Sequence, residues 1–239
     1  MVVSAQSVMI ELLLLDLDGV VILELTPPHV IEMEIILLHE LLDDLLSQIG
    51  IPVVILTHRS RAEAKLILQS ANIRDIAGII AAEDIFKAAL KCKPWRLLRD
   101  GLRKSWALKT IEQRYGINRQ NIAFIDDRQH ILDDMMSNGL GLAILAPSVI
   151  APDGSSLESF DFGQLIDTIK GWDRSKSFVC LNSHHILIEE WRRTGVRTRP
   201  IAKHAFNLAR YHAGWMRRIW LKFFPRHATP GITSENTHE

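Results

Sequence analysis

Acidic residues and a threonine follow three apolar runs of the sequence, at spacings that could bring them together. Asp16 and Asp18 come after the run MIELLLL, Thr57 comes after IPVVIL, and Asp126 and Asp127 close the run NIAFIDD. Carboxylates gathered at one place repel each other unless a cation lies among them, and their hard oxygen atoms suit Mg²⁺. These residue types therefore predict a magnesium site.

Phosphoryl transfer is the chemistry that such a group of carboxylates could perform. A carboxylate beside bound Mg²⁺ can attack a phosphoryl group, because the metal and a nearby cation neutralise the charge that otherwise repels the nucleophile. A second carboxylate two residues further on, as Asp18 is from Asp16, can protonate the leaving oxygen and later deprotonate water. The pattern is thus compatible with a covalent aspartyl-phosphate.

The elements that would position these residues alternate along the chain. Short apolar runs that resemble buried strands occupy residues 9–15, 51–56, 76–80, 121–125 and 140–145. Between them lie stretches with helical spacing of apolar residues, predicted at 29–49, from Arg61 onward, at 104–115 and ahead of Asn138. Strands that alternate with helices predict a doubly wound α/β fold with a parallel sheet. Ligands of such sheets bind outside the carboxyl ends of the strands, where the acidic residues stand.

Four motifs in this order resemble the haloacid dehalogenase-like (HAD) superfamily. They cover residues 9 to 146, and they are LLLLDLDGV with Asp16 and Asp18, VVILTHR with Thr57, KSWALKTIEQRYGI with Lys104, and IAFIDD with Asp126 and Asp127. The resemblance implies a HAD-like Rossmannoid α/β fold and a Mg²⁺-dependent phosphatase of this superfamily.

The resemblance also implies a role for each catalytic residue. Asp16 would be the nucleophile and a metal ligand, and Asp18 the general acid and base, with its backbone carbonyl also on the metal. Thr57 and Lys104 would hold the phosphate. Other lysines near the third motif are alternatives to Lys104, namely Lys91, Lys93 and Lys109.

The resemblance extends to the metal ligands and to access to the site. Asp127 would ligate Mg²⁺, and Asp126 would ligate it or orient it through water. Only 38 residues lie between Asp18 and Thr57 and 46 between Thr57 and Lys104, so we expect no large cap domain and an open site. His58 and Arg59, which follow Thr57, are candidates for contact with the substrate.

The strand and helix alternation stops after a segment rich in Pro, Ser and Gly at 147–160. We therefore predict a phosphohydrolase domain at 1–150 and, at 151–239, a linker with a basic, helical C-terminal appendage. Helices are expected there at 161–171, 180–193 and 200–224.

The formal net charge of zero conceals an uneven distribution. Residues 1–171 carry 16 basic and 23 acidic side chains, whereas residues 172–239 carry 12 basic and 5 acidic ones. Within 191–226 there are ten Lys or Arg and no Asp or Glu, interleaved with aromatic residues. A basic amphipathic helix of this kind could pack on the acidic domain, lie on an anionic membrane surface or bind nucleic acid.

These observations predict a Mg²⁺-dependent phosphohydrolase that acts on an unidentified phosphomonoester through an aspartyl-phosphate. The alternatives are a phosphatase of nucleic-acid ends and a non-catalytic binding or regulatory module that uses the basic segment. Two cysteines, Cys92 and Cys180, form no disulfide framework. We accordingly expect a cytoplasmic protein, with peripheral attachment to a membrane as an alternative, and the sequence leaves its oligomeric state open.

Overall fold

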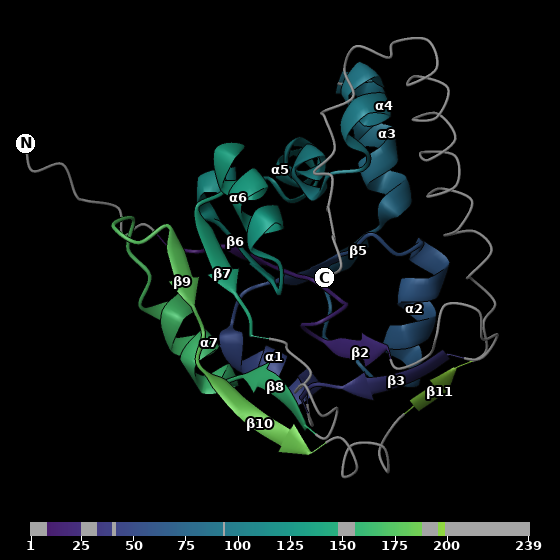
Figure 1. Ribbon diagram of the computed structural model, residues 1–239. Helices are drawn as coiled ribbons and strands as arrows, with labels where there is room; N and C mark the ends of the chain where they lie inside the picture. Colours follow the sequence, from purple (N-terminus) through teal and green to yellow (C-terminus); the bar gives the residue numbers. More distant parts are fainter. Residues whose placement is uncertain are drawn as a thin grey trace, which may run out of the picture.

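A six-stranded parallel sheet forms the centre of the computed structural model, which describes residues 9–24, 33–39, 42–92, 94–147, 156–187 and 196–198 (Figure 1). From one edge to the other its strands are β5 (Gly78–Ile80), β4 (Val53–Leu56), β1 (Leu12–Leu15), β6 (Ile122–Asp126), β7 (Leu142–Leu145) and β9 (Phe178–Cys180). All five neighbouring pairs are parallel. The five predicted strands are thus all present, and the predicted fold class is confirmed.

Both faces of the sheet are covered, which explains why its strands are apolar throughout. Successive side chains of a strand point to opposite faces, so Leu13 and Leu15 of β1 enter one core and Leu12 and Leu14 enter the other. All four leucines are buried. A strand with only one covered face would alternate apolar and polar residues instead.

The helices divide between the two faces of the sheet (Figure 1). The core of Leu13 and Leu15 is completed by α1 (Leu42–Ile49), α2 (Arg61–Ser70) and α7 (Phe162–Lys170). The core of Leu12 and Leu14 is completed by α3 (Ala82–Cys92), α4 (Pro94–Asp100), the 3₁₀ turn η1 (Lys104–Ala107), α5 (Leu108–Tyr115) and α6 (Gln129–Ser137). A second 3₁₀ turn, η2 (Arg119–Asn121), precedes β6.

A small antiparallel sheet occupies part of the region where one helix was predicted at 29–49. It contains β2 (Ile22–Glu24), β3 (Met33–Leu37) and β11 (Val196–Thr198), with β3 in the middle. The helix α1 begins only at Leu42. The prediction was wrong for residues 33–37 because a short apolar run fits a strand as well as a helix, and pairing on both sides favours the strand here.

Strands also replace the described part, 180–187, of the helix that was predicted at 180–193. β9 ends at Cys180, and β10 (Ser183–Leu187) pairs with β8 (Ser156–Phe160) in a two-stranded antiparallel sheet. The helix predicted at 161–171 is confirmed as α7. Because α7 and β9 pack on the main sheet, residues beyond 150 contribute to the same core, and the division of the chain into two domains at 150 remains a prediction.

The basic segment 191–226 lies outside the described residues except for β11, as does the helix predicted at 200–224. Its suggested binding to a membrane surface or to nucleic acid therefore stays a prediction. Within the described part of the chain, no helix combines the length and the apolar character needed to cross a membrane.

Candidate active site

Three neighbouring strands deliver the predicted residues to one edge of the sheet. β1 lies between β4 and β6, and these strands run directly into Asp16, Thr57 and Asp126. Backbone hydrogen bonds continue the sheet into two of these residues, since Asp16 N donates to Ile125 O at 3.0 Å and Thr57 N donates to Ile80 O at 3.0 Å. The carboxyl ends of the strands therefore hold these residues rigidly.

Three carboxylates converge at this edge. Asp16, Asp126 and Asp127 each offer a carboxylate oxygen, and the three oxygens lie within 4.8 Å of one another. Asp16 and Asp126 are buried, and the Oδ1 atom of Asp127 is buried without a hydrogen-bond partner. Buried polar atoms in folded proteins are nearly always satisfied. A hard divalent cation bound among these oxygens would satisfy them, so the donor set fits such an ion.

Close approach of the backbone at Gly19 brings Asp127 into this group. A Cβ atom at position 19 would lie 2.3 Å from Asp127 Oδ2, and Gly19 has a φ of +77°. Both the contact and the backbone angle require glycine here. This explains physically why glycine follows Asp18 in the first motif.

Lys104 lies between two of the three carboxylates. Its Nζ atom is 2.7 Å from Asp16 Oδ2 and 2.7 Å from Asp126 Oδ2, and its side chain is buried. Burial by itself lowers the pKa of Lys104, but the charges of the two aspartates outweigh it and the pKa is raised above its ordinary value. The two aspartates therefore favour the ammonium form of Lys104.

The alternatives to Lys104 stand elsewhere. Lys91 and Lys109 are exposed to solvent, and Lys93 lies outside the described residues. Lys104 opens the 3₁₀ turn η1, and Ala107, buried in the same turn, belongs to the core on that face of the sheet. This packing turns the lysine toward the strand ends.

The carboxylates hold more negative charge than Lys104 alone can balance. Burial raises the pKa of Asp16 to about 7; Lys104 opposes this rise, and the charges of Asp126 and Asp18 add to it. Burial also raises the pKa of Asp126 and of Asp127, and the charge of Asp16 adds to the rise for Asp127. Without a further cation the site therefore favours protonated carboxyl groups, and a bound cation would compete with these protons.

Asp18 is held by Arg59 from the loop after β4. Arg59 Nε donates to both carboxylate oxygens of Asp18, at 3.0 and 2.8 Å. The same guanidinium group donates to Glu24 Oε2 at 2.7 Å and to Glu63, and Arg59 is buried. Arg59 was predicted to contact substrate, and that role remains a prediction. In the structure, Arg59 orients Asp18 through its hydrogen bonds to both carboxylate oxygens.

The other two predicted residues of this segment, Thr57 and His58, differ in their surroundings. Thr57 is fully buried, and its Oγ1 atom accepts a hydrogen bond from Arg59 N at 3.1 Å. His58 is half-buried and lines a cavity of about 340 Å³. Lys104 forms part of the wall of this cavity.

Further residues of the cavity were not found by the sequence analysis. They are Asp100, Leu102, Arg103, Arg128, His130, Ile131 and Asp134. Arg128 immediately follows the acidic pair of the fourth motif, which is a signal that could have identified it. Arg103 directly precedes Lys104 of the third motif, which is a similar signal.

No protein-family model matches the chain, and no curated protein matches it significantly. Among solved structures, the chain is similar to the N-terminal part of a Bacteroides fragilis protein that contains a phosphatase domain complexed with Mg, with 16% identity over 58% of this chain and 36% of that chain and a TM-score of 0.41. It thus spans about a third of the length of that structure.

Two similar structures match over most of their length. One is the 3-deoxy-D-manno-octulosonate 8-phosphate phosphatase of Moraxella catarrhalis in complex with magnesium ion, phosphate ion and KDO. The match has 16% identity and a TM-score of 0.39, and it covers 90% of this chain and 93% of that chain. The other is a putative HAD superfamily (subfamily III A) hydrolase of Legionella pneumophila, with 16% identity, 89% and 90% coverage and a TM-score of 0.38.

Proposed function

We propose that the protein is a Mg²⁺-dependent phosphohydrolase that cleaves a phosphomonoester through an aspartyl-phosphate on Asp16. The observation that carries the proposal is the position of Asp16. Its carboxylate contacts the Lys104 ammonium group and lies beside the carboxylates of Asp126 and Asp127. A carboxylate in contact with a fixed cation and next to a site for a second cation is suited to attack a phosphoryl group.

Asp16, Asp126 and Asp127 would hold the magnesium ion, together with the backbone carbonyl of Asp18. When bound, the ion supplies positive charge that neutralises the phosphoryl oxygens and polarises the phosphorus toward attack. Oxygen donors alone make up this set, which favours Mg²⁺ over softer metals.

Asp16 would attack phosphorus, forming an O–P bond as the bond between phosphorus and the leaving oxygen breaks. Lys104 would hold a phosphoryl oxygen as negative charge develops on it, while the Thr57 hydroxyl group would donate a hydrogen bond to another. Water then attacks the aspartyl-phosphate, which releases inorganic phosphate and regenerates the Asp16 carboxylate.

Asp18 would transfer the protons that this sequence needs. It would protonate the leaving oxygen in the first half and accept a proton from the attacking water in the second. Arg59 supports this role because its contacts with both oxygens hold the Asp18 carboxylate in one orientation. Asp18 is the predicted acid and base, and Arg59 is a positioning residue.

Hydrolysis of para-nitrophenyl phosphate by the full chain tests the proposal. We expect turnover with Mg²⁺, no turnover with excess chelator, and loss of turnover in Asp16→Asn, whose side chain cannot form the aspartyl ester. The exposed Asp133→Asn on α6 is the matched control and should keep the wild-type rate. Equal rates for the wild type and Asp16→Asn would overturn the proposal.

A further inference from the structure

The cavity beside Lys104 is built from the same loops that carry the predicted reaction residues. His58 directly follows Thr57, Arg128 directly follows Asp127, and Lys104 lies in the wall itself. A phosphomonoester whose phosphate group lay against Lys104 would therefore direct its alcohol part into this cavity. The cavity is thus the place for the leaving group.

The volume and the lining limit what this leaving group can be. About 340 Å³ is near the lower end of the range for small-molecule sites. Only Leu102 and Ile131 are apolar among the lining residues, and the others are charged or are histidines. A small, polar organic group fits such a space, whereas a large apolar one does not.

The cations of the cavity differ in how far protein carboxylates already neutralise them. Arg103 Nη1 lies 3.1 Å from Asp134, and Arg103 Nη2 lies 3.4 Å from Asp100. Lys104 is held by Asp16 and Asp126. The guanidinium of Arg128 is different, since its Nε atom is 3.7 Å from Asp127 Oδ1, beyond hydrogen-bond distance, while the two side chains are similarly exposed, Arg128 at 48% and Arg103 at 44%.

Arg128 is also fixed at its backbone. Its N–H group donates to Asp126 Oδ1 at 2.9 Å, and the residue occupies the position directly before α6. The guanidinium group is therefore anchored beside the acidic pair while its donors remain available to a ligand. An arginine fork of this kind matches the two oxygens of a carboxylate or a phosphate. His58 and His130 line the same cavity.

We propose that Arg128 binds a second anionic group on the substrate, so that the protein prefers small phosphomonoesters whose leaving group carries a carboxylate or another phosphate. This inference rests on the proposed phosphohydrolase function and names its substrate class. Arg128, and not Arg103, sets the preference because Arg103 is already paired with two aspartates.

Matched substrates that differ only in the second anion provide the test. For the carboxylate, 3-phosphoglycerate is compared with glycerol 3-phosphate; for the phosphate, fructose 1,6-bisphosphate is compared with fructose 6-phosphate. A charge-assisted hydrogen bond corresponds to a factor of about ten or more. We expect kcat/KM to be higher by about this factor for the charged member of at least one pair, and the pair that shows it identifies the anion.

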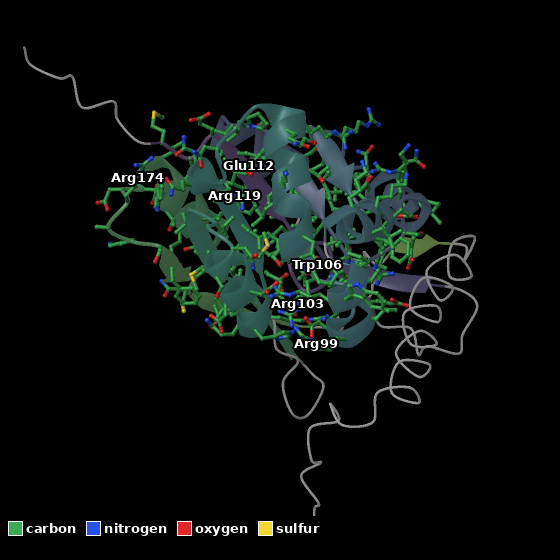
Figure 2. All side chains as sticks on the ribbon, turned by 90° about the horizontal axis from the view of Figure 1, so that it is seen from above. Arg99, Arg103, Trp106, Glu112, Arg119 and Arg174 are labelled. Carbon is green, nitrogen blue, oxygen red and sulfur yellow. The ribbon has the colours of Figure 1, made fainter. Side chains whose placement is uncertain are left out.

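Variants assign the preference to Arg128. In Arg128→Gln the ratio of kcat/KM within the pair should fall to near one, and in Arg128→Lys it should be intermediate because the charge remains without the fork. Arg174→Gln makes the same change at an exposed arginine well apart from Arg103 in Figure 2, and should keep the wild-type ratio. Equal kcat/KM for both members in the wild type, or a preference that survives Arg128→Gln, would overturn the inference.

Binding measurements separate this inference from the proposed function. The same pairs are titrated calorimetrically into the wild type and Arg128→Gln without added metal. Tighter binding of the charged member that is lost in Arg128→Gln supports the Arg128 site even if no phosphomonoester is hydrolysed. The opposite result is turnover of all four compounds with equal kcat/KM and equal binding affinity within each pair. It would support the phosphohydrolase function and overturn the Arg128 site.

Discussion

The Nζ atom of Lys104 lies 2.7 Å from Oδ2 of Asp16, and both side chains are buried. This contact joins residues that are distant in sequence and places a fixed positive charge against the proposed nucleophile. Because Lys104 also contacts Asp126, it has two roles. It reduces repulsion between two carboxylates in the free protein, and it would stabilise the transferring phosphoryl group in the reaction.

Replacement of Lys104 by methionine should abolish most of the activity while the chain still folds. Loss of a charged donor from the transition state costs about 100-fold or more in kcat. The buried carboxylates also lose their cation, so the melting temperature without metal should fall and Mg²⁺ should partly restore it. Lys109→Met, at an exposed position of α5, is the control. A Lys104→Met variant as active as Lys109→Met would contradict this role.

The metal-free protein should become more stable when Asp16 is replaced by asparagine at pH 8. The pKa of Asp16 is raised to about 7 by burial, so the folded state binds a proton more tightly than the unfolded state does. Asp16 therefore stabilises the folded state fully at pH values below its unfolded pKa. This contribution is lost as the pH rises through the folded-state pKa of about 7. Asp16→Asn carries no such charge, and its melting temperature at pH 8 should exceed that of the wild type by about 3 °C or more.

The pH dependence provides the check on this prediction. The melting temperature of the metal-free wild type should fall between pH 6 and pH 8 by more than that of Asp16→Asn. Saturating Mg²⁺ should reduce the difference between the two proteins, since the metal stabilises the charged carboxylate. If the melting temperatures of the two metal-free proteins change with pH in parallel, burial does not destabilise the charged Asp16 carboxylate, and the prediction is wrong.

Gly19→Ala should weaken metal binding. The new Cβ atom would lie 2.3 Å from Asp127 Oδ2, so the carboxylate must move away from Asp16 and Asp126. We expect the Mg²⁺ concentration for half-maximal activity to rise by about tenfold, a typical cost of disturbing a metal ligand. Gly50→Ala is a matched control because Gly50 has a φ of +76° and no atom within 4 Å of the new Cβ. It imposes the same backbone strain without the contact, and its Mg²⁺ dependence should not change.

Arg59→Lys should impair proton transfer to poor leaving groups. A lysine keeps the positive charge but cannot contact both oxygens of Asp18, so the general acid loses its fixed orientation. Alkyl phosphates need protonation of the leaving oxygen, whereas para-nitrophenyl phosphate hardly needs it. We expect kcat to fall by about tenfold for an alkyl phosphate and much less for the aryl phosphate.

A matched variant separates this effect from a general loss of structure. Arg61→Lys alters an arginine two residues away that pairs with Asp84 instead. It should reduce neither rate. An equal loss on alkyl and aryl phosphates in Arg59→Lys would show that Arg59 has a structural role and does not position Asp18.

Five of the six strands of the main sheet, and the three strand ends that carry the site, could be predicted from the sequence for a local reason, whereas β9 was not predicted. Five short apolar runs alternate with helical stretches, a pattern that favours buried parallel strands, and parallel strands place their carboxyl ends at one edge. The convergence of Asp16, Thr57 and Asp126 follows from that rule alone. The apolar run at 33–37 satisfied the helical and the extended patterns equally, so only its pairing with β2 and β11 resolved it.

The sequence by itself thus determined which carboxylates gather at the strand ends, which fold carries them and which cation their oxygen atoms suit, since residue type and strand order along the chain are local properties. Only the tertiary structure decided which lysine serves the site, that Arg59 holds Asp18, and that Arg103, Arg128 and His130 line one cavity with His58. Each of these depends on distances between residues that are separated along the chain. Such distances are set by how the helices pack on the sheet, and no spacing in the sequence encodes them.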